Sequence, residues 1–248
     1  MIEINNLKKS YKNAKNETPF SVDNINIKAE KGKIIGILGP NGSGKSTILK
    51  SICGFHFPDE GNIKLTQNDT SLCLTSSCIP ENVMNFIGYV PEISTLPPDM
   101  SVQEFLLYVC ALHQINQIDL KKYVKMCSLE KVLSKKIKTL SKGFQQRVSL
   151  AQALLYNPEN LILDEIISGL DPAQIVQTRQ LIKKLSCEKA IIMSTHILQE
   201  VTVLCDYVYV IYNGKITAQG TEKDIIEQCK TSTFEEAFIK LTSGTENE

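Results

Sequence analysis

The sequence predicts an α/β fold built on a mainly parallel sheet, and two observations support this expectation. Short, continuously apolar segments are typical of parallel strands buried on both faces, and they occur at 33–39 (KIIGILG), 161–165 (LILDE), 190–196 (AIIMSTH) and 207–212 (YVYVIY). Helical sequence lies between them, and strands that alternate with helices are most simply joined as a parallel sheet. A length of 248 residues is long for one domain but acceptable for this class.

Two features near the ends of the chain have a different pattern. The segments at 2–6 (IEINN) and 20–29 (FSVDNINIKA) alternate polar and apolar residues, which predicts half-buried strands. Near the other end, Asn213-Gly214 separates the strand YVYVIY from KITAQG, and this dipeptide is a signal for a type I′ hairpin.

The segment GPNGSGKST (39–47) fits the phosphate-binding loop pattern G-x-x-x-x-G-K-[ST]. It follows a predicted strand and leads into STILKSICG, a helix expected to end at Gly54, which is the context that this motif requires. Glycines let the backbone curl so that successive N–H groups face the phosphates, and the helix N-terminus adds its positive dipole end. We therefore predict a nucleotide site whose loop consists of Gly39, Pro40, Asn41, Gly42, Ser43 and Gly44.

Three side chains at the start of this helix complete the predicted phosphate site. Lys45 is placed to reach the β- and γ-phosphates of the nucleotide. Ser46 can bind Mg²⁺ through its hydroxyl, and Thr47 can contact the α-phosphate.

The middle of the chain, about 93–157, has a helical character. Ser101-x-x-Glu104 is a capping box in front of an apolar run at 105–115, and helical sequence continues through VKMCSLEKVL at 124–133. We therefore expect a helical subdomain inserted into the α/β core.

Two later helices have recognisable start signals. Asp171-Pro172 indicates an N-cap followed by proline at the first helical position, and it predicts a helix to about Leu185. Thr233-x-x-Glu236 predicts the start of a last short helix, FEEAFIKL.

Composition restricts the kind of partner and the compartment. The 27 basic and 27 acidic residues balance, so no net field favours nucleic acid or an anionic membrane. No apolar run approaches the ~20 residues of a membrane span, and the first residues lack the apolar core of a signal peptide. We expect an intracellular protein whose membrane contact comes through a partner. The eight cysteines lack C-x-x-C spacing, so reduced thiols are favoured over a zinc or redox site around Cys73 and Cys78.

Four further motifs follow the phosphate-binding loop in order: LSKGF (140–144), LILDE (161–165), SGLD (168–171) and STH (194–196). Together with the loop they resemble the nucleotide-binding subunit of an ATP-binding cassette (ABC) transporter, and the resemblance extends over about 2–240. It implies a P-loop NTPase core with a mainly parallel sheet, an N-terminal antiparallel β subdomain and the inserted helical subdomain.

The resemblance also implies domain boundaries within a single nucleotide-binding domain. We expect the ATP-binding core at 1–92 and 158–225 and the helical subdomain at 93–157. A short C-terminal helix and tail are expected at 226–248.

Three residues acquire catalytic or metal-binding roles from this resemblance. Asp164 and Glu165 end a strand, where ligands bind in α/β sheets. By the family pattern Asp164 holds Mg²⁺ through water, and Glu165 polarises the attacking water as general base. His196 would reach the γ-phosphate and the same water.

LSKGF resembles the family's signature motif, which is usually LSGGQ. Ser141 is expected to cap the helix QQRVSLAQALL, while its hydroxyl and the Gly143 N–H bind the γ-phosphate held by the opposite subunit. Lys142 and Phe144 depart from the usual Gly and Gln. Neither change removes the hydroxyl or the amide, so we expect a working motif in which only the contact from Gln to the sugar is in doubt.

Three single residues have both a functional and a plain interpretation. Glu92 stands where the family has a Gln that contacts Mg²⁺ and links the site to the membrane partner; the alternative is a solvated loop acid. Tyr11 is in the position of the aromatic residue that stacks on adenine, or it is a packed residue at a strand end. Asp171 crosses the dimer interface, caps its helix, or does both.

The resemblance implies an ATPase with the cofactors ATP and Mg²⁺ that dimerises around two ATP molecules. A homodimer is favoured, and it would drive a separate integral-membrane permease from the cytoplasmic face of the membrane. The permease groove is expected at the helical subdomain and the loop around Glu92. LSKGF, YVPE and TFEEAFIKL resemble two-component exporters, so export is favoured over import.

Three alternatives stay open at this point. A soluble cassette ATPase of translation or DNA repair usually has two cassettes or a long coiled coil, and the chain shows no sustained heptads. A regulatory module without catalysis is disfavoured by the intact Lys45, Asp164, Glu165 and His196. A P-loop kinase or GTPase would have no role for LSKGF, SGLD and STH.

Overall fold

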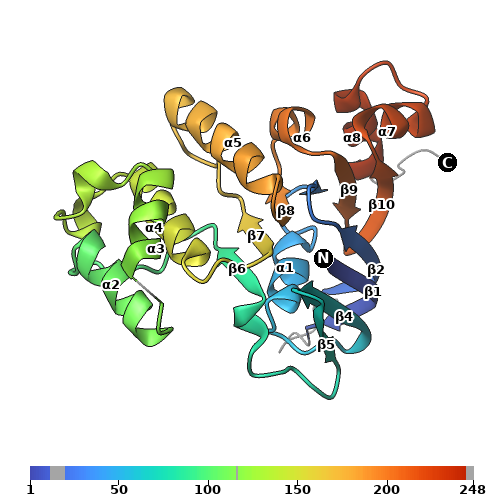
Figure 1. The fold of residues 1–248 in the computed structure, drawn as a ribbon. Coiled ribbons are helices and arrows are strands. Elements are labelled where there is room, and N and C mark those ends of the chain that lie inside the picture. Colours follow the sequence, from blue (N-terminus) through green and yellow to red (C-terminus); the bar gives the residue numbers. More distant parts are fainter. Residues whose placement is uncertain (12–19, 116, 244–248) are drawn as a thin grey trace.

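The computed structural model describes residues 1–11, 20–115 and 117–243 (Figure 1). Its larger sheet has six strands in the order β10-β9-β3-β8-β7-β6, and every neighbouring pair is parallel except β9 with β10. The strands are β3 (Ile34–Leu38), β6 (Ile87–Val90), β7 (Asn160–Asp164), β8 (Ala190–Thr195), β9 (Tyr207–Tyr212) and β10 (Lys215–Gly220). The prediction of a mainly parallel sheet is therefore confirmed.

A second sheet has four antiparallel strands in the order β2-β1-β4-β5. It consists of β1 (Ile2–Ser10), β2 (Ser21–Ala29), β4 (Glu60–Gln67) and β5 (Thr70–Thr75). This is the expected antiparallel subdomain, although β4 and β5 had not been identified as strands. Each has only two alternating aliphatic residues, Ile63 and Leu65 in β4 and Leu72 and Leu74 in β5, and polar residues flank both pairs.

Eight α-helices are present in the described residues. They are α1 (Lys45–Ile52), α2 (Val102–Leu112), α3 (Gln117–Met126), α4 (Lys142–Leu154), α5 (Pro172–Ser186), α6 (Leu198–Leu204), α7 (Glu222–Cys229) and α8 (Phe234–Thr242). Short 3₁₀ turns occur at Val83–Asn85, Glu130–Val132 and Ile137–Thr139. None of the described helices is long and apolar enough to cross a membrane.

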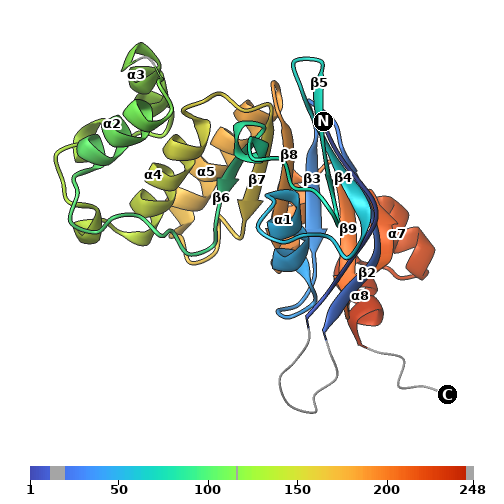
Figure 2. The ribbon, with the colours of Figure 1, turned by 90° about the horizontal axis from the view of Figure 1, so that it is seen from below.

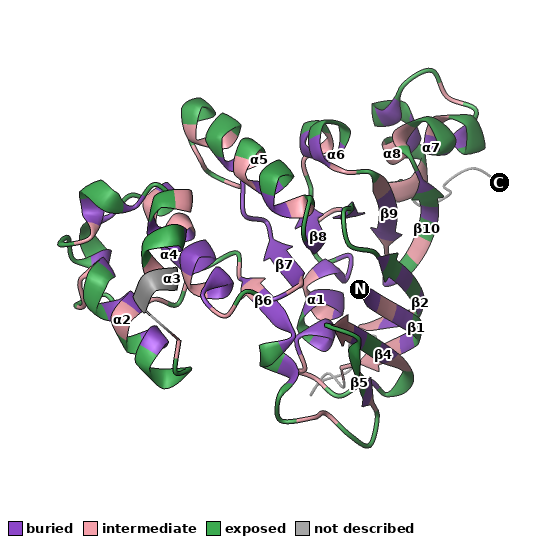
Figure 3. Ribbon diagram, viewed as in Figure 1, coloured by how far each residue is buried: buried purple, intermediate pink, exposed green. Residues whose placement is uncertain are grey.

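The helices lie at different edges of the main sheet (Figures 1 and 2). The group α2, α3 and α4 extends from the β6 edge, whereas α7 and α8 lie near β9 and β10. One hydrophobic core joins α1, the antiparallel sheet and the main sheet, and a second joins α2–α5 to the main sheet. The strands β7 and β8 are buried along their whole length (Figure 3), and so is β3.

Several predicted local signals are confirmed by hydrogen bonds. Ser101 and Glu104 form a capping box, in which each side chain accepts from the other residue's backbone N–H at 3.2 and 2.8 Å. Thr233 caps α8 by accepting from the Glu236 N–H at 3.2 Å. Asn213 has a φ of 47°, and the following glycine is also left-handed, as a type I′ turn requires.

Other local expectations were wrong. The helical sequence expected at 124–133 is interrupted, because α3 ends at Met126, Ser128 has a left-handed φ of 55°, and only a 3₁₀ turn follows at Glu130–Val132. The chain is closed there by backbone bonds that satisfy helix carbonyls, including Leu129 N–H to Val124 O at 2.9 Å. The helix α7 was missed, although its Thr221 cap accepts from the Asp224 N–H at 3.3 Å.

Candidate nucleotide-binding site

The glycine-rich segment forms a tight loop between β3 and α1. Gly42 and Gly44 have φ angles of 81° and 114°, which favour glycine strongly over residues with a Cβ atom. A Cβ atom on Gly44 would also lie 2.6 Å from Cγ1 of Val22, whereas one on Gly42 would point into open space. The loop is therefore packed against β2 on one side and open on the other.

The β9–β10 hairpin supports this loop from behind. The Gly214 N–H donates to the Ser43 carbonyl at 2.9 Å, and the Asp23 N–H donates to the Gly214 carbonyl at 2.9 Å. A Cβ atom on Gly214 would meet the backbone of Ser21. The hairpin that the sequence predicts thus has a second role as a support for the phosphate loop, which sequence reasoning missed.

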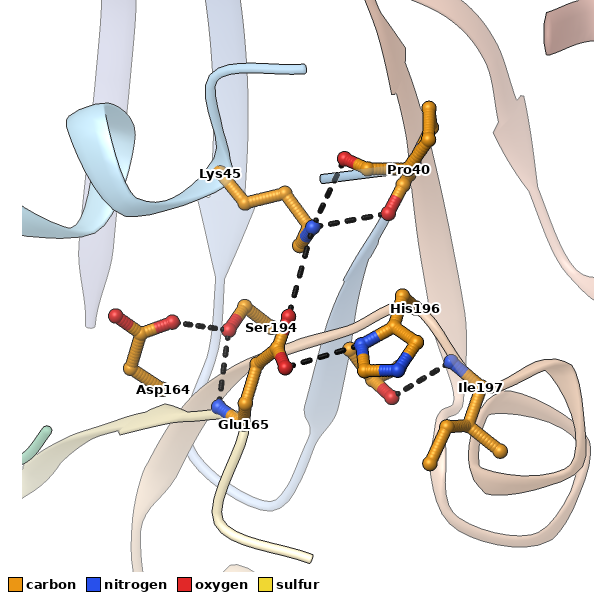
Figure 4. Close-up of polar contacts among 9 residues, drawn as sticks. Pro40, Lys45, Asp164, Glu165, Ser194, His196 and Ile197 are labelled. Atoms are coloured by element: carbon orange, nitrogen blue, oxygen red, sulfur yellow. Dashed lines mark hydrogen bonds and ion pairs between the residues drawn. The ribbon is translucent and has the colours of Figure 1, made fainter. Parts of the chain in front are cut away.

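Lys45, the first residue of α1, is only 5% exposed. Its Nζ donates to the carbonyls of Gly39 and Pro40 at 2.9 and 3.1 Å and lies 3.6 Å from Oε1 of Glu165 (Figure 4). The ammonium is therefore fixed at the open edge of the loop, beside the positive end of the helix dipole. This is a suitable place for the charge of a phosphate group.

Asp164 ends β7 with a buried carboxylate. Its Oδ1 accepts a hydrogen bond from the Ser194 hydroxyl at 2.5 Å (Figure 4). Burial raises the pKa of the Asp164 carboxyl above its ordinary value, and the neighbouring Glu165 adds to this, whereas the hydrogen bonds from Ser194 and Ser46 lower it. Ser194, at the end of β8, is a functional neighbour that sequence reasoning missed within the STH motif.

Glu165 joins the strand ends β7 and β8 to His196. Its backbone N–H donates to the Ser194 hydroxyl at 3.1 Å, and its φ is 47°, which is uncommon for a residue with a Cβ atom. Oε2 of Glu165 lies 3.0 Å from Nδ1 of His196 (Figure 4). The carboxylate is 9% exposed and is shared between an ammonium and an imidazole.

A cavity of about 440 Å³ opens above the phosphate loop. Its walls come from the loop, the start of α1, and three residues that are distant in sequence: Phe20, Glu92 and Glu165. The ammonium and the backbone N–H groups of the loop suit phosphate, and the hydroxyl of Ser46 with the nearby carboxylates forms the oxygen donor set that Mg²⁺ prefers. These residues therefore fit a nucleotide phosphate chain together with Mg²⁺.

Tyr11, expected to stack on adenine, does not line this cavity. Its N–H donates to the Phe20 carbonyl at 2.9 Å, and its ring meets the edge of His56 with centroids 5.7 Å apart. Phe20 is the aromatic residue in the cavity wall. It is the first residue of the strand predicted at 20–29 and lies just before the observed start of β2 at Ser21, and its own pattern did not distinguish it from a packed strand residue.

The segments 140–144 and 168–171, called the signature region below, lie outside this cavity. Ser141 occupies the N-cap position of α4, but its side chain makes no capping hydrogen bond, so the expected cap is wrong. The helix also begins at Lys142, earlier than expected. Ser141 is exposed at the N-terminus of this helix.

The signature region is packed against the first turns of α5. Gly143 is buried, and a Cβ atom there would overlap the amide of Gln174. Asp171 accepts from the Gln174 N–H at 2.9 Å, so it caps α5 as one of the two roles expected of it. Lys142 extends over Gly169, because a Cβ atom on that glycine would lie 2.9 Å from the lysine Nζ.

Comparison with known proteins agrees with this architecture. The family model described as ABC transporter matches residues 22–168. The ABC transporter ATP-binding protein YxlF of Bacillus subtilis is 30% identical over 240 residues, which cover 94% of this chain and 75% of that protein. The ABC transporter ATP-binding protein YdbJ of the same organism is 37% identical over 216 residues, covering 82% and 68%. Nod factor export ATP-binding protein I of Burkholderia thailandensis is 34% identical over 215 residues, covering 83% and 67%.

Solved structures show the same arrangement of elements. An ATP-binding subunit of an ABC transporter superposes with a TM-score of 0.81 at 26% identity, and covers 97% of this chain and 98% of that one. The dimeric post-hydrolysis state of the ATP-binding cassette MJ0796, bound to ADP and Pi, gives a TM-score of 0.76 at 25% identity, covering 89% and 98%. The chain therefore belongs to the ABC transporter family, as one of its ATP-hydrolysing subunits.

Proposed function

We propose that two copies of this chain close around two ATP molecules with Mg²⁺ and that this closure drives a separate membrane permease, in the direction of export. The observation that carries the proposal is the cluster in which Glu165 contacts both Lys45 and His196 beside the open cavity. This supports the proposal because a cation, a base and an imidazole would then lie beside the terminal phosphate of a nucleotide bound on this loop.

Each residue of the cluster has a distinct task in this proposal. Lys45 exchanges the carbonyls of Gly39 and Pro40 for phosphate oxygens, since all of these are acceptors at its ammonium. Glu165 accepts the proton of the attacking water, and His196 holds the carboxylate in place through its Nδ1 contact.

The metal would be held by oxygen atoms of Ser46, Asp164 and Glu92. When bound, Mg²⁺ neutralises charge on the phosphate oxygens. Glu92 and Ser46 line the same cavity, and Asp164 accepts a hydrogen bond from Ser194 at the neighbouring strand end. Asp164 binds as a carboxylate, so the burial that raises its pKa also favours a nearby cation.

The dimer is proposed because the N-terminus of α4 in the signature region lacks a side-chain cap. Ser141 is exposed and its side chain makes no capping bond, and the first N–H groups of α4 have no partner within the helix. An anion supplied by a second copy, the γ-phosphate on its Lys45, would satisfy these donors. The MJ0796 cassette is a dimer in its solved structures.

A permease would dock at the helical region, near the loop that contains Glu92. Large apolar side chains are exposed there without an obvious internal reason: Ile93 is 76% exposed, Leu112 is 64% exposed, and Tyr108 is 57% exposed. This arrangement would place the chain on the cytoplasmic face of a membrane. Export is proposed from the motifs LSKGF and YVPE and from relatives that are named as export proteins.

The test is light scattering of the Glu165→Gln variant with Mg-ATP and with Mg-ADP. The variant should form a dimer with Mg-ATP but not with Mg-ADP, because ATP binding is retained while hydrolysis is blocked. Adding Ser141→Ala to this variant should abolish the dimer without changing ATP binding to the monomer. A monomer in both nucleotides would contradict the self-pairing subunit.

A further inference from the structure

A second cleft lies between α3 and the end of α5, and it shares no lining residue with the nucleotide cavity. It has a volume of about 680 Å³ and adjoins a smaller cavity of about 250 Å³, with Met126 and Lys184 in the walls of both. We call the larger one the lysine cleft, because its wall includes Lys122, Lys125, Lys184 and Lys189.

Lys189 is a buried cation in this wall, with an exposed fraction of 4%. Its Nζ donates to Oδ1 of Asn157 at 3.0 Å and to the Pro158 carbonyl at 2.6 Å, and within the described ranges no carboxylate lies in ion-pair distance of it. Burial is the largest influence on the Lys189 ammonium and lowers its pKa. Buried charges in proteins normally have a directly paired counter-charge, whereas here the carboxylates of Glu188 and Glu159 act on the ammonium only from beyond ion-pair distance.

The other charges around the cleft increase this imbalance. Lys122 and Lys125 on α3 face Lys184 on α5 across the opening, and Glu188 is the one carboxylate among the lining residues that the structure describes. The smaller cavity adds Arg147, whose guanidinium donates to the Gln177 amide oxygen, and none of the lining residues described for this cavity is acidic. The chain as a whole is neutral, so this excess of positive charge is local.

We propose that the lysine cleft binds a small organic polyanion, a phosphate ester or a polycarboxylate with two or more negative charges. The volume lies within the usual range of ligand sites, roughly 300–1,000 Å³. The lysines of the wall can supply charge-assisted hydrogen bonds to such an anion, and Met126 and Leu185 give an apolar wall for its carbon skeleton.

Binding of this anion would act on the relation between the helical region and the core. The cations of the cleft come from α3 on one side and from α5 and the start of β8 on the other, so they repel one another across the opening. An anion between them would replace the repulsion by attraction and draw α3 toward the core. The site is therefore also a place where a metabolite could influence the ATPase.

The chain offers a local probe for the test, because Met126 lines the cleft, whereas Met84, Met100 and Met193 do not. Protein labelled with ¹³C at the methionine methyl groups is titrated without nucleotide, at about 0.15 M salt, with citrate and with a hexose bisphosphate, using acetate as the monoanion control. The Met126 resonance should shift and saturate with at least one of the two polyanions. The polyanion whose titration has the lower midpoint concentration shows whether the cleft prefers carboxylate or phosphate groups. No shift up to about 10 mM of either polyanion would overturn the proposal.

Two double variants with equal charge loss separate a site from general attraction. Lys122→Met with Lys184→Met removes two cleft lysines, and Lys121→Met with Lys183→Met removes two exposed neighbours that do not line the cleft. The first pair should weaken the polyanion about tenfold or more, and the second less than about twofold. Equal weakening by both pairs would overturn the proposal. Because nucleotide is omitted, the result does not depend on the proposed dimer or permease.

Discussion

The nucleotide cavity and the signature region differ in how completely a single chain builds them. In the cavity, Lys45 and Glu165 are at most 9% exposed and are held by partners of the same chain (Figure 4). In the signature region, Ser141 is exposed and its hydroxyl makes no capping bond. One site is therefore organised by internal contacts before any ligand arrives, whereas the other leaves an exposed serine at a helix N-terminus, where we propose that a second copy binds.

The catalytic half of this comparison is tested most strongly at Glu165. Changing Glu165 to Gln keeps the size and one oxygen but removes the base, so steady ATP turnover should fall about 10²–10⁴-fold. ATP affinity should change little, since Lys45 and the phosphate loop are intact. Phosphate release measured beside isothermal titration with ATP checks both statements. Turnover within a few-fold of the unchanged protein would remove Glu165 from its proposed role.

The binding half of the cavity depends on Lys45. Its change to Ala removes a charge-assisted contact and leaves the buried Glu165 without its cation, so ATP affinity should fall roughly tenfold to a hundredfold. Titration calorimetry with ATP measures the effect, and Lys50→Ala, an exposed lysine on the same helix, is the matched control. Unchanged affinity in Lys45→Ala would count against the phosphate-loop assignment.

Alanine substitution at the two N-cap positions of the signature region should affect stability at one position and dimerisation at the other. Asp171 caps α5, so Asp171→Ala should lower the free energy of unfolding by about 1 kcal/mol. Ser141 makes no cap bond, so Ser141→Ala should change it by less than about 0.5 kcal/mol while it weakens ATP-dependent dimerisation. Urea unfolding and light scattering separate the two effects. A large loss of stability in Ser141→Ala would show that its hydroxyl is structural.

Much of the cavity follows from the sequence because its parts are local. The loop and Lys45 occupy consecutive positions at 39–45, and Asp164 and Glu165 are adjacent at the end of a strand, so each motif has a local geometry that its sequence predicts. His196 was also expected, and the structure places it against Glu165. In each case the chemistry and the chain direction at the end of a strand act together.

The parts that could not be predicted are set by contacts between distant segments. Ser194 reaches Asp164 only because β8 is paired with β7, and Gly214 reaches the phosphate loop only because β9 lies beside β3. Phe20 lines the cavity because the start of β2 packs against the phosphate loop, where a Cβ atom on Gly44 would lie 3.3 Å from the Phe20 ring. None of these relations leaves a local pattern in the sequence.

Substitution of Glu92 by Gln is expected to change ATPase activity least. Glu92 lines the nucleotide cavity but, like Ser141, is exposed. The carboxylates of Asp164 and Glu165, by contrast, are buried. Glu92→Gln keeps an oxygen ligand for Mg²⁺, and ATPase activity should fall by less than roughly tenfold. Glu92→Ala removes every ligand atom and should reduce activity further and raise the Mg²⁺ concentration needed for half-maximal turnover. Equal activity of the two variants would mean that Glu92 does not serve the metal, whereas complete loss in Glu92→Gln would assign the carboxylate charge itself a task that an amide oxygen cannot perform.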